Sequence, residues 1–305
     1  MRELENKLDT TRNGMKEVEL VWDGKLEGLL NSTGCIRVRG LPDYRVKFNP
    51  TLLVGKHKEK FSTTSGEFQY PRAIAIHSET NNIYICDCGN NRVQVFNESL
   101  EFLFKISSQM KSPAGICINL DRVYVTQSII HCLAVYSIRG IFIASAGREG
   151  RKELEFAYPK GVAVSTQNNI LYICDWLNNR IQCLNTDLSF NSFICDVPLP
   201  KDIKVTSRDI LVLTGGDPCI RIYDHSHVLS REIIPCGGQL SESGYFCLDT
   251  ESNIIISAQC VLIYSYRGEL IHKFGKFNNL RGIGLDSNCR IVAVSEDTNS
   301  CVHLF

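Results

Sequence analysis

Two pairs of opposite charges in this chain have a spacing that could serve chemistry. Asp87 is followed five residues later by Arg92, and Asp175 is followed at the same spacing by Arg180. A carboxylate beside a cation can act as an acid or a base, because the cation shifts its protonation. The identical spacing in two matching loops favours a structural role instead. We predict two ion pairs that hold their loops, and no catalytic residues.

Other catalytic patterns are missing from the sequence. The seven histidines are dispersed, and His225 and His227 lie in a turn-like segment without a partnered cysteine or carboxylate pattern. The sequence has no CxxC pair, no nucleophile elbow and no phosphate-binding glycine loop. We therefore expect no metal, no cofactor and no enzymatic activity from this chain.

Composition excludes several partners. The 33 Lys and Arg residues balance the 33 Asp and Glu residues, so no net charge draws the chain to nucleic acid or to membranes. No stretch approaches the roughly 20 apolar residues of a membrane span, and residues 1–30 are too charged for a signal peptide. Most of the 14 cysteines lie in apolar segments. We predict reduced thiols and a cytoplasmic protein.

The two charge pairs belong to a long repeated segment, Phe68 to Phe96 and Phe156 to Leu184. Both copies have an apolar strand, a polar turn, an aromatic-led strand, an Asn-rich loop and a further apolar strand. Six such units begin 37 to 46 residues apart, at Ile74, Ile116, Val162, Ile203, Phe246 and Ile283. That period is typical of four-stranded propeller blades. The sequence predicts an all-β, six-bladed β-propeller over residues 49–305.

The last unit reaches Phe305 after only three strands. A blade that ends there would expose an unpaired strand edge, which promotes aggregation. Residues 51–54 (TLLV) precede the first unit in the frame of a fourth strand. We predict that they complete the last blade and close the ring.

The first 50 residues differ from the rest. Apolar residues between Met1 and Leu30 recur at steps of 3, 4 or 7, with charges on the other faces. This heptad pattern predicts an amphipathic helix over residues 1–30, either a coiled-coil tail that forms a homodimer or a lone helix that docks on its own domain. Residues 31–48 are expected to be a linker with a short strand, Cys35 to Val38.

Units one and three, YPRAIAI…NNIYICDCGNNRVQVF and YPKGVAV…NNILYICDWLNNRIQCL, resemble the NHL repeat of six-bladed propellers. The resemblance covers residues 51–305 and is weaker in the other four units, which lack the Asp–Asn–Arg loop. Such propellers often end tripartite-motif proteins, after a RING, B-boxes and a coiled coil. The resemblance implies a platform for protein binding and substrate recruitment in a ubiquitin-ligase context, although this chain has no RING or B-box pattern. Because some members of the family read single-stranded RNA and some NHL-like propellers are lyases or lactonases, RNA binding and channel-site lyase or hydrolase activity remain alternatives.

The predicted propeller places one binding surface at the mouth of its channel. The residue after the repeat proline enters each first strand near this mouth, and the six residues are Arg72, Ala114, Lys160, Lys201, Gly244 and Arg281. Four of the six are cationic, which predicts a positive collar for an anionic ligand. Trp176 is expected on the same face, where it could bind protein or stack on a base. Asn91 and Asn179 complete the predicted ligand-binding set.

Overall fold

The structure is a computed structural model that describes residues 66–216, 218–234, 244–275, 277, 279–295 and 302–305. Before residue 66 it describes only the backbone of four short strands. The chain divides into two compact units, Met1–Pro42 and Asp43–Phe305.

In the first unit, strand β1 (Gly28–Leu30) pairs antiparallel with β2 (Ile36–Val38). The helix predicted over residues 1–30 lies outside the described residues, except that its last three residues form β1. The linker predicted over residues 31–48 is described only at β2, within the short strand expected there.

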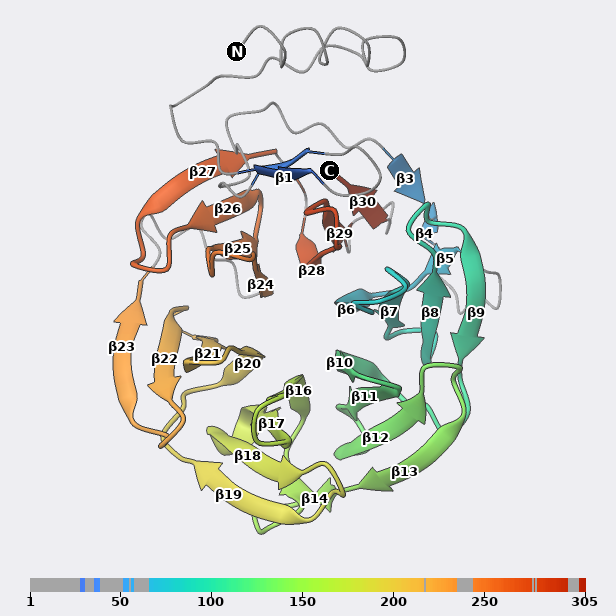
Figure 1. The fold of residues 1–305 in the computed structure, drawn as a ribbon. Coiled ribbons are helices and arrows are strands. Elements are labelled where there is room, and N and C mark those ends of the chain that lie inside the picture. Colours follow the sequence, from blue (N-terminus) through green and yellow to red (C-terminus); the bar gives the residue numbers. More distant parts are fainter. Residues whose placement is uncertain are drawn as a thin grey trace, which may run out of the picture. The chain divides into compact units, whose positions relative to one another are not determined.

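The second unit is a ring of six four-stranded antiparallel sheets (Figure 1). Blade 1 contains β6 (Pro71–Ile76), β7 (Ile83–Asp87), β8 (Arg92–Phe96) and β9 (Phe102–Ile106). Blade 2 contains β10 (Pro113–Asn119), β11 (Arg122–Gln127), β12 (Cys132–Ser137) and β13 (Phe142–Ala146). Blade 3 contains β16 (Pro159–Val164), β17 (Ile170–Asp175), β18 (Arg180–Asn185) and β19 (Phe190–Ile194). The first strand of each blade is innermost and the fourth is outermost. The prediction of an all-β, six-bladed propeller is confirmed.

The other three blades complete the ring. Blade 4 contains β20 (Pro200–Val205), β21 (Asp209–Thr214), β22 (Ile220–Asp224) and β23 (Leu229–Ile233). Blade 5 contains β24 (Phe246–Leu248), β25 (Ile254–Ser257), β26 (Val261–Tyr264) and β27 (Leu270–Phe274). Blade 6 contains β28 (Leu280–Leu285), β29 (Ile291–Ser295), β30 (Val302–Leu304) and β3 (Leu52–Val54). Strand β3 pairs antiparallel with β30, with Leu53 opposite His303. The N-terminal strand therefore supplies the fourth strand of the last blade and joins the two ends of the ring.

Shorter elements lie in the loops. We call the segment that precedes the first strand of a blade its lead-in loop. Parallel pairs form in the lead-in loops of blades 1 and 3, between β4 (Lys56–His57) and β5 (Glu67–Phe68) and between β14 (Arg148–Glu149) and β15 (Glu155–Phe156). A 3-10 turn, η1 (Trp176–Asn178), follows β17. In the described part of the chain, no helix has the length and hydropathy needed to cross a membrane.

The hydrophobic core lies between blades. Residues alternate in direction along a strand, so each middle strand contacts both neighbouring blades. On β7, Ile83 and Ile85 pack with Val292 and Val294 of blade 6, while Tyr84 and Cys86 pack toward blade 2. The side chains of β7 and β8 are all buried. This packing fixes each blade, and therefore each loop, against the next.

The strand order places two kinds of loop on one side of the ring. Where the structure describes them, the lead-in loops and the loops between second and third strands meet at the same sheet edge, as in blade 1, where Pro71 pairs with Asp87 and Asp87 pairs with Arg92. We call this side the loop face. The turns between first and second strands and between third and fourth strands lie on the opposite face.

Candidate functional site

Asp87 is the centre of a hydrogen-bonded cluster on the loop face of blade 1. Its carboxylate accepts the backbone N–H of Gln69 at 2.7 Å, Nε of Arg92 at 2.7 Å and Nδ2 of Asn90 at 2.9 Å. The Arg92 guanidinium and the Gln94 amide both donate to the carbonyl oxygen of Glu67 in the lead-in loop. Burial raises the pKa of Asp87, and these donors oppose the shift by stabilising the carboxylate.

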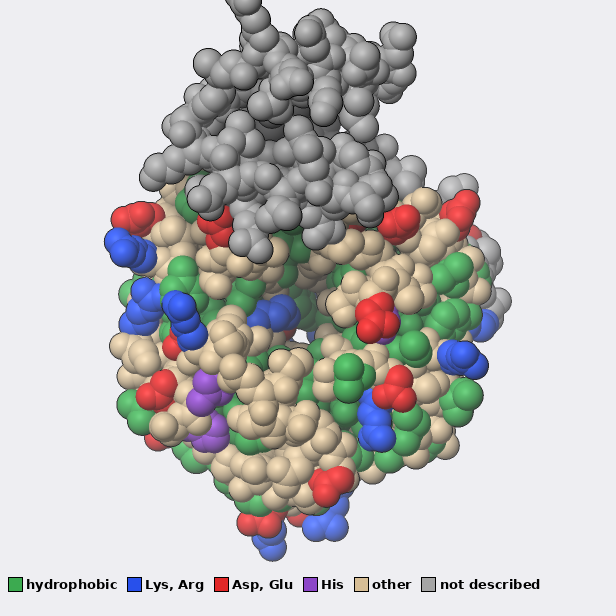
Figure 2. Space-filling view, viewed as in Figure 1, with side chains coloured by type: hydrophobic (Ala, Val, Ile, Leu, Met, Phe, Trp, Pro, Cys, Tyr) green, Lys and Arg blue, Asp and Glu red, His purple; other side chains and the backbone are tan. Residues whose placement is uncertain are grey.

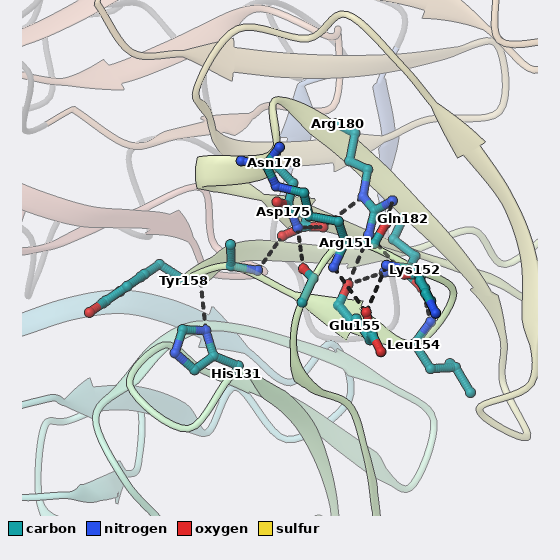
Figure 3. Close-up of polar contacts among 12 residues, drawn as sticks. His131, Arg151, Lys152, Leu154, Glu155, Tyr158, Asp175, Asn178, Arg180 and Gln182 are labelled. Atoms are coloured by element: carbon teal, nitrogen blue, oxygen red, sulfur yellow. Dashed lines mark hydrogen bonds and ion pairs between the residues drawn. The ribbon is translucent and has the colours of Figure 1, made fainter.

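Blade 3 repeats the same cluster (Figure 3). Asp175 accepts the backbone N–H of Ala157 at 2.7 Å and Nε of Arg180 at 2.7 Å. The guanidinium of Arg180 donates to the carbonyls of Arg151, Lys152 and Glu155. We call each set of Asp, Asn, Arg and Gln a loop clamp. Both charge pairs lie inside loop clamps, where they hold a lead-in loop.

Asn91 and Asn179, the predicted ligand contacts, join neighbouring blades. Oδ1 of Asn91 accepts the backbone N–H of Ser112 in blade 2 at 2.8 Å, and Oδ1 of Asn179 accepts that of Leu199 in blade 4 at 2.9 Å. Both asparagines have left-handed backbone, with φ of 53°. Their acceptor oxygens are therefore engaged within the ring.

His131 makes the equivalent contact from blade 2, and the sequence predictions missed it. Its Nδ1 accepts the backbone N–H of Tyr158 in blade 3 at 3.1 Å, and its φ is 54° (Figure 3). The sequence alignment of the units could have indicated this contact, because His131 aligns with Asn91 and Asn179 without a gap. A histidine in one blade and an asparagine in two others thus accept the same backbone hydrogen bond from the next blade.

The four predicted cations enter the first strands of blades 1, 3, 4 and 6. Arg72, Lys160 and Arg281 are half-buried, whereas Lys201 is 5% exposed. Burial lowers the pKa of Lys201 to about 6, helped by the charges of Arg281, Lys160 and Arg72, while Asp202 raises it. Four strands distant in sequence therefore bring these charges within electrostatic reach of each other. Figure 2 shows a narrow opening at the centre of the ring.

Glycines let the innermost strands approach closely enough to form this mouth. A Cβ at Gly115 would overlap the carbonyl oxygen of Lys160, and a Cβ at Gly282 would overlap that of Arg72. The hydroxyl of Thr126 in blade 2 donates to the Lys160 carbonyl, and that of Ser257 in blade 5 donates to the Arg281 carbonyl. The backbone of the cationic residues is therefore fixed by the neighbouring blade.

Trp176 lies under one of the cations. Nζ of Lys160 lies 3.1 Å from the centroid of the Trp176 ring, a cation–π contact. The ring is half-buried, and its neighbour Leu177 is 43% exposed. Trp176 therefore belongs to the channel mouth, where it supports Lys160.

Two further side chains at the mouth were not predicted. Asp202 and Tyr245 occupy the position at which units two, three and six have glycine. Asp202 accepts two bonds of 3.0 Å from Nζ of Lys204, and the ring of Tyr245 lies 5.5 Å from Nζ of Lys201. These two residues could have been found from the sequence, because a charged or bulky residue stands where other units have glycine.

Exposed apolar side chains accompany the cations on the loop face. They are Tyr70 (50% exposed), Ile129 (63%), Ile130 (43%), Tyr158 (42%) and Leu177 (43%), all in blades 1 to 3. The two tyrosines have φ of 51° and 54° immediately before the repeat proline. This left-handed backbone is strained for a bulky residue. The loop face thus combines positive charge with accessible apolar surface.

Comparisons with known proteins agree with this geometry. The sequence model of the NHL repeat matches residues 68–96 and 156–184. The protein brain tumor of Drosophila melanogaster is 26% identical over an alignment of 123 residues that covers 37% of this chain and 11% of that protein. The matched region is thus a small part of that relative.

Solved structures share the fold at low identity. A Xanthomonas campestris protein described as a gluconolactonase has a TM-score of 0.63 and 12% identity, over 78% of this chain and 87% of its own. A chain of a nidogen/laminin complex has a TM-score of 0.59 and 14% identity, over 68% and 81%. Hydrazine synthase of Kuenenia stuttgartiensis has a TM-score of 0.56 and 12% identity, over 77% and 79%. The chain thus contains two segments that match the NHL repeat, within a six-bladed β-propeller.

Proposed function

We propose that this chain is a non-catalytic protein-binding platform, and that its loop face receives an acidic segment of a partner. The observation that carries the proposal is the convergence of Arg72, Lys160, Lys201 and Arg281 on one mouth in a chain without net charge. A cluster of charges of one sign attracts the opposite charge. The exposed apolar residues beside it supply the area that a protein partner would bury.

Binding has more support than catalysis because the buried aspartates of this face have structural partners. Asp87 and Asp175 belong to the loop clamps, and Asp202 pairs with Lys204. Among the described residues no group of three His, Cys, Asp or Glu side chains is arranged to hold a metal. Burial raises the pKa of the Cys117 and Cys247 thiols to about 12, which keeps them protonated and poorly nucleophilic.

The proposed context is substrate recruitment for a ubiquitin ligase in the cytoplasm. The NHL repeats and the partial similarity to the brain tumor protein support this setting. Residues 1–30 would contribute a dimerising coiled coil, as their heptads predict. The free cysteines of the described residues suit a reducing compartment.

Single-stranded RNA is the second candidate ligand, because the same cations could contact phosphates. The two ligands differ in their salt dependence. Neutralising phosphates of a single strand lowers log affinity by roughly 0.7 per contact for each log unit of salt. A protein segment that also buries apolar surface depends less steeply on salt.

The test compares two fluorescent probes on the full chain, an acidic peptide rich in Glu and Leu and an oligouridylate of 20 nucleotides. Anisotropy titrations at 50 to 300 mM salt measure both affinities. We expect the peptide to bind more tightly near physiological salt and to retain affinity as salt rises. Tighter RNA binding with a steep salt slope would replace protein by RNA as the ligand. Binding of neither probe would refute the proposal.

A further inference from the structure

Blade 2 contains a pocket on the loop face, with a volume of about 340 Å³. It lies between the lead-in loop of blade 2 and the strands that follow that loop. Its lining residues are Ser107, Gln109, Met110, Lys111, Gln127, Ile130, Cys132, Phe142 and Ser145. The volume is at the lower end of the roughly 300–1,000 Å³ that ligand pockets occupy.

In blades 1 and 3 the loop clamp lies at the corresponding place. Aligned without gaps, Asp87, Asn90, Arg92 and Gln94 of blade 1 correspond to Gln127, Ile130, Cys132 and Ala134 of blade 2. In blade 3, Arg180 stacks on Phe193 at 4.1 Å, and the strand registers place Ser145 of blade 2 where blade 3 has Phe193. Small side chains thus replace an arginine, a glutamine and a phenylalanine, and the pocket is the volume that they leave.

The glutamine at position 127, where the clamps have aspartate, suits a site that has lost the clamp arginine. Gln127 keeps one bond of the clamp, because its Oε1 accepts the backbone N–H of Lys111 as Asp87 accepts that of Gln69. Since Cys132 provides no positive charge, a carboxylate at position 127 would be buried without an ion pair, and the neutral amide avoids that penalty. The lead-in loop of blade 2, residues 107–112, is also shorter than that of blade 3, residues 147–158.

We propose that this pocket receives one large apolar side chain, of Leu, Met or Phe size, from an extended partner peptide, and that an adjacent acidic residue of the peptide pairs with Lys111. Met110, Ile130, Cys132 and Phe142 supply an apolar lining. Lys111 is exposed at the rim and supplies the complementary charge.

The neighbouring blades indicate what kind of segment lies here. In blades 1 and 3 a further extended piece of the chain, β4 or β14, pairs with the strand that carries the clamp-bound carbonyl of Glu67 or Glu155. The equivalent residues of blade 2 are Gln109 and Met110, and no described strand pairs with them. The exposed Ile129 continues the apolar surface beyond the pocket. This inference rests on the proposed function, and it names the residue class that the loop face selects.

The experiment selects random 12-residue peptides, displayed on phage, with the full chain as bait. Synthetic copies of the enriched peptides are then titrated by anisotropy. We expect them to share one Leu, Met or Phe beside Asp or Glu. Replacing that residue by Ala should weaken binding at least tenfold.

Two variants of the chain test the pocket directly. Gln127→Asp, Cys132→Arg and Ala134→Gln together restore the aspartate, arginine and glutamine of the clamp. The arginine at position 132 should fill much of the pocket, and the variant should weaken binding at least tenfold. Ile130→Asn, the residue of both clamps, should weaken binding without filling the volume, and it keeps the test decisive if the triple variant does not fold. Leu120→Asn, a change of the same kind at a residue 78% exposed on the opposite face, is the control and should bind normally.

The outcomes separate this inference from the proposed function. Peptides that bind through the channel-mouth cations but are indifferent to the pocket variants would overturn the pocket and leave the protein-binding platform standing. Enriched peptides without a shared apolar residue would do the same. A library that yields no binding peptide would contradict both.

Discussion

The imidazole of His131 in blade 2 holds the backbone N–H of Tyr158 in blade 3, with 3.1 Å between Nδ1 and N. Asn91 and Asn179 hold the corresponding N–H groups of blades 2 and 4. Three successive blade junctions on the loop face are therefore closed by one side-chain acceptor each. The contact also fixes the strained backbone of Tyr158, a residue that is 42% exposed.

Removing this acceptor should destabilise the propeller, whereas replacing it by asparagine should not. His131→Ala leaves the half-buried N–H of Tyr158 without its partner, and an unsatisfied buried donor costs about 1–3 kcal/mol. His131→Asn supplies the amide oxygen that the other two junctions use. Urea unfolding of both variants at pH 8 measures the difference. Equal losses of unfolding free energy in His131→Ala and His131→Asn would show that the hydrogen-bond acceptor at position 131 does not stabilise the propeller.

The loop clamp of blade 1 should behave as a unit. Asp87 is fully buried and Arg92 is 3% exposed. Arg92→Met leaves a buried carboxylate without its ion pair, which typically costs about 3–5 kcal/mol. Asp87→Asn combined with Arg92→Met should lose much less than the sum of the single changes, because the remaining groups are neutral as in blade 2. A double-mutant cycle in urea measures this coupling, and strict additivity would contradict it.

Lys201 should make stability depend on pH. Its pKa falls from 10.5 unfolded to about 6 folded. Between these values the unfolded state binds more protons, so stability rises with pH, and the full penalty is present below pH 6. Lys201→Met should therefore raise the melting temperature most at pH 6 and below, and progressively less toward pH 10. An increase in melting temperature that is the same at every pH would mean that folding does not shift the pKa of Lys201.

The N-terminal segment provides a separate prediction. If residues 1–30 form a coiled coil, the full chain should be a dimer, and deletion of these residues should yield a monomer of the same fold. Light scattering gives the masses and circular dichroism checks the propeller. A full-length monomer would exclude the coiled coil and leave the helix that docks on its own domain.

Most of the ring was predictable because its signals are local. Alternating apolar residues marked the strands, and an incomplete last unit pointed to residues 51–54, which pair with β30. The Asp–Arg spacing predicted ion pairs that are present in blades 1 and 3. Each of these features depends on a single segment or on repetition, so one sequence suffices to find it.

The missed features depend on substitution within the repeat. His131 replaces an asparagine that it does not resemble chemically, and the buried Tyr245 replaces a glycine of units two, three and six. The pocket of blade 2 arises only when a short loop coincides with Cys132 and Ser145. Its volume depends on side chains from three segments, so no single motif could indicate it.

The most direct measurement compares charge reversal on the two faces. Arg72→Glu, Lys160→Glu and Arg281→Glu together reverse the channel mouth, and Arg139→Glu, Arg208→Glu and Arg267→Glu together make the same net change at exposed turns of the opposite face. Both triple variants are titrated with the acidic peptide at physiological salt, after unfolding curves have shown that each is folded. We predict that the mouth variant loses at least tenfold in affinity and that the opposite-face variant stays within twofold of the unmodified chain. Equal losses in the two variants, or no loss at the mouth, would contradict a binding site on the loop face.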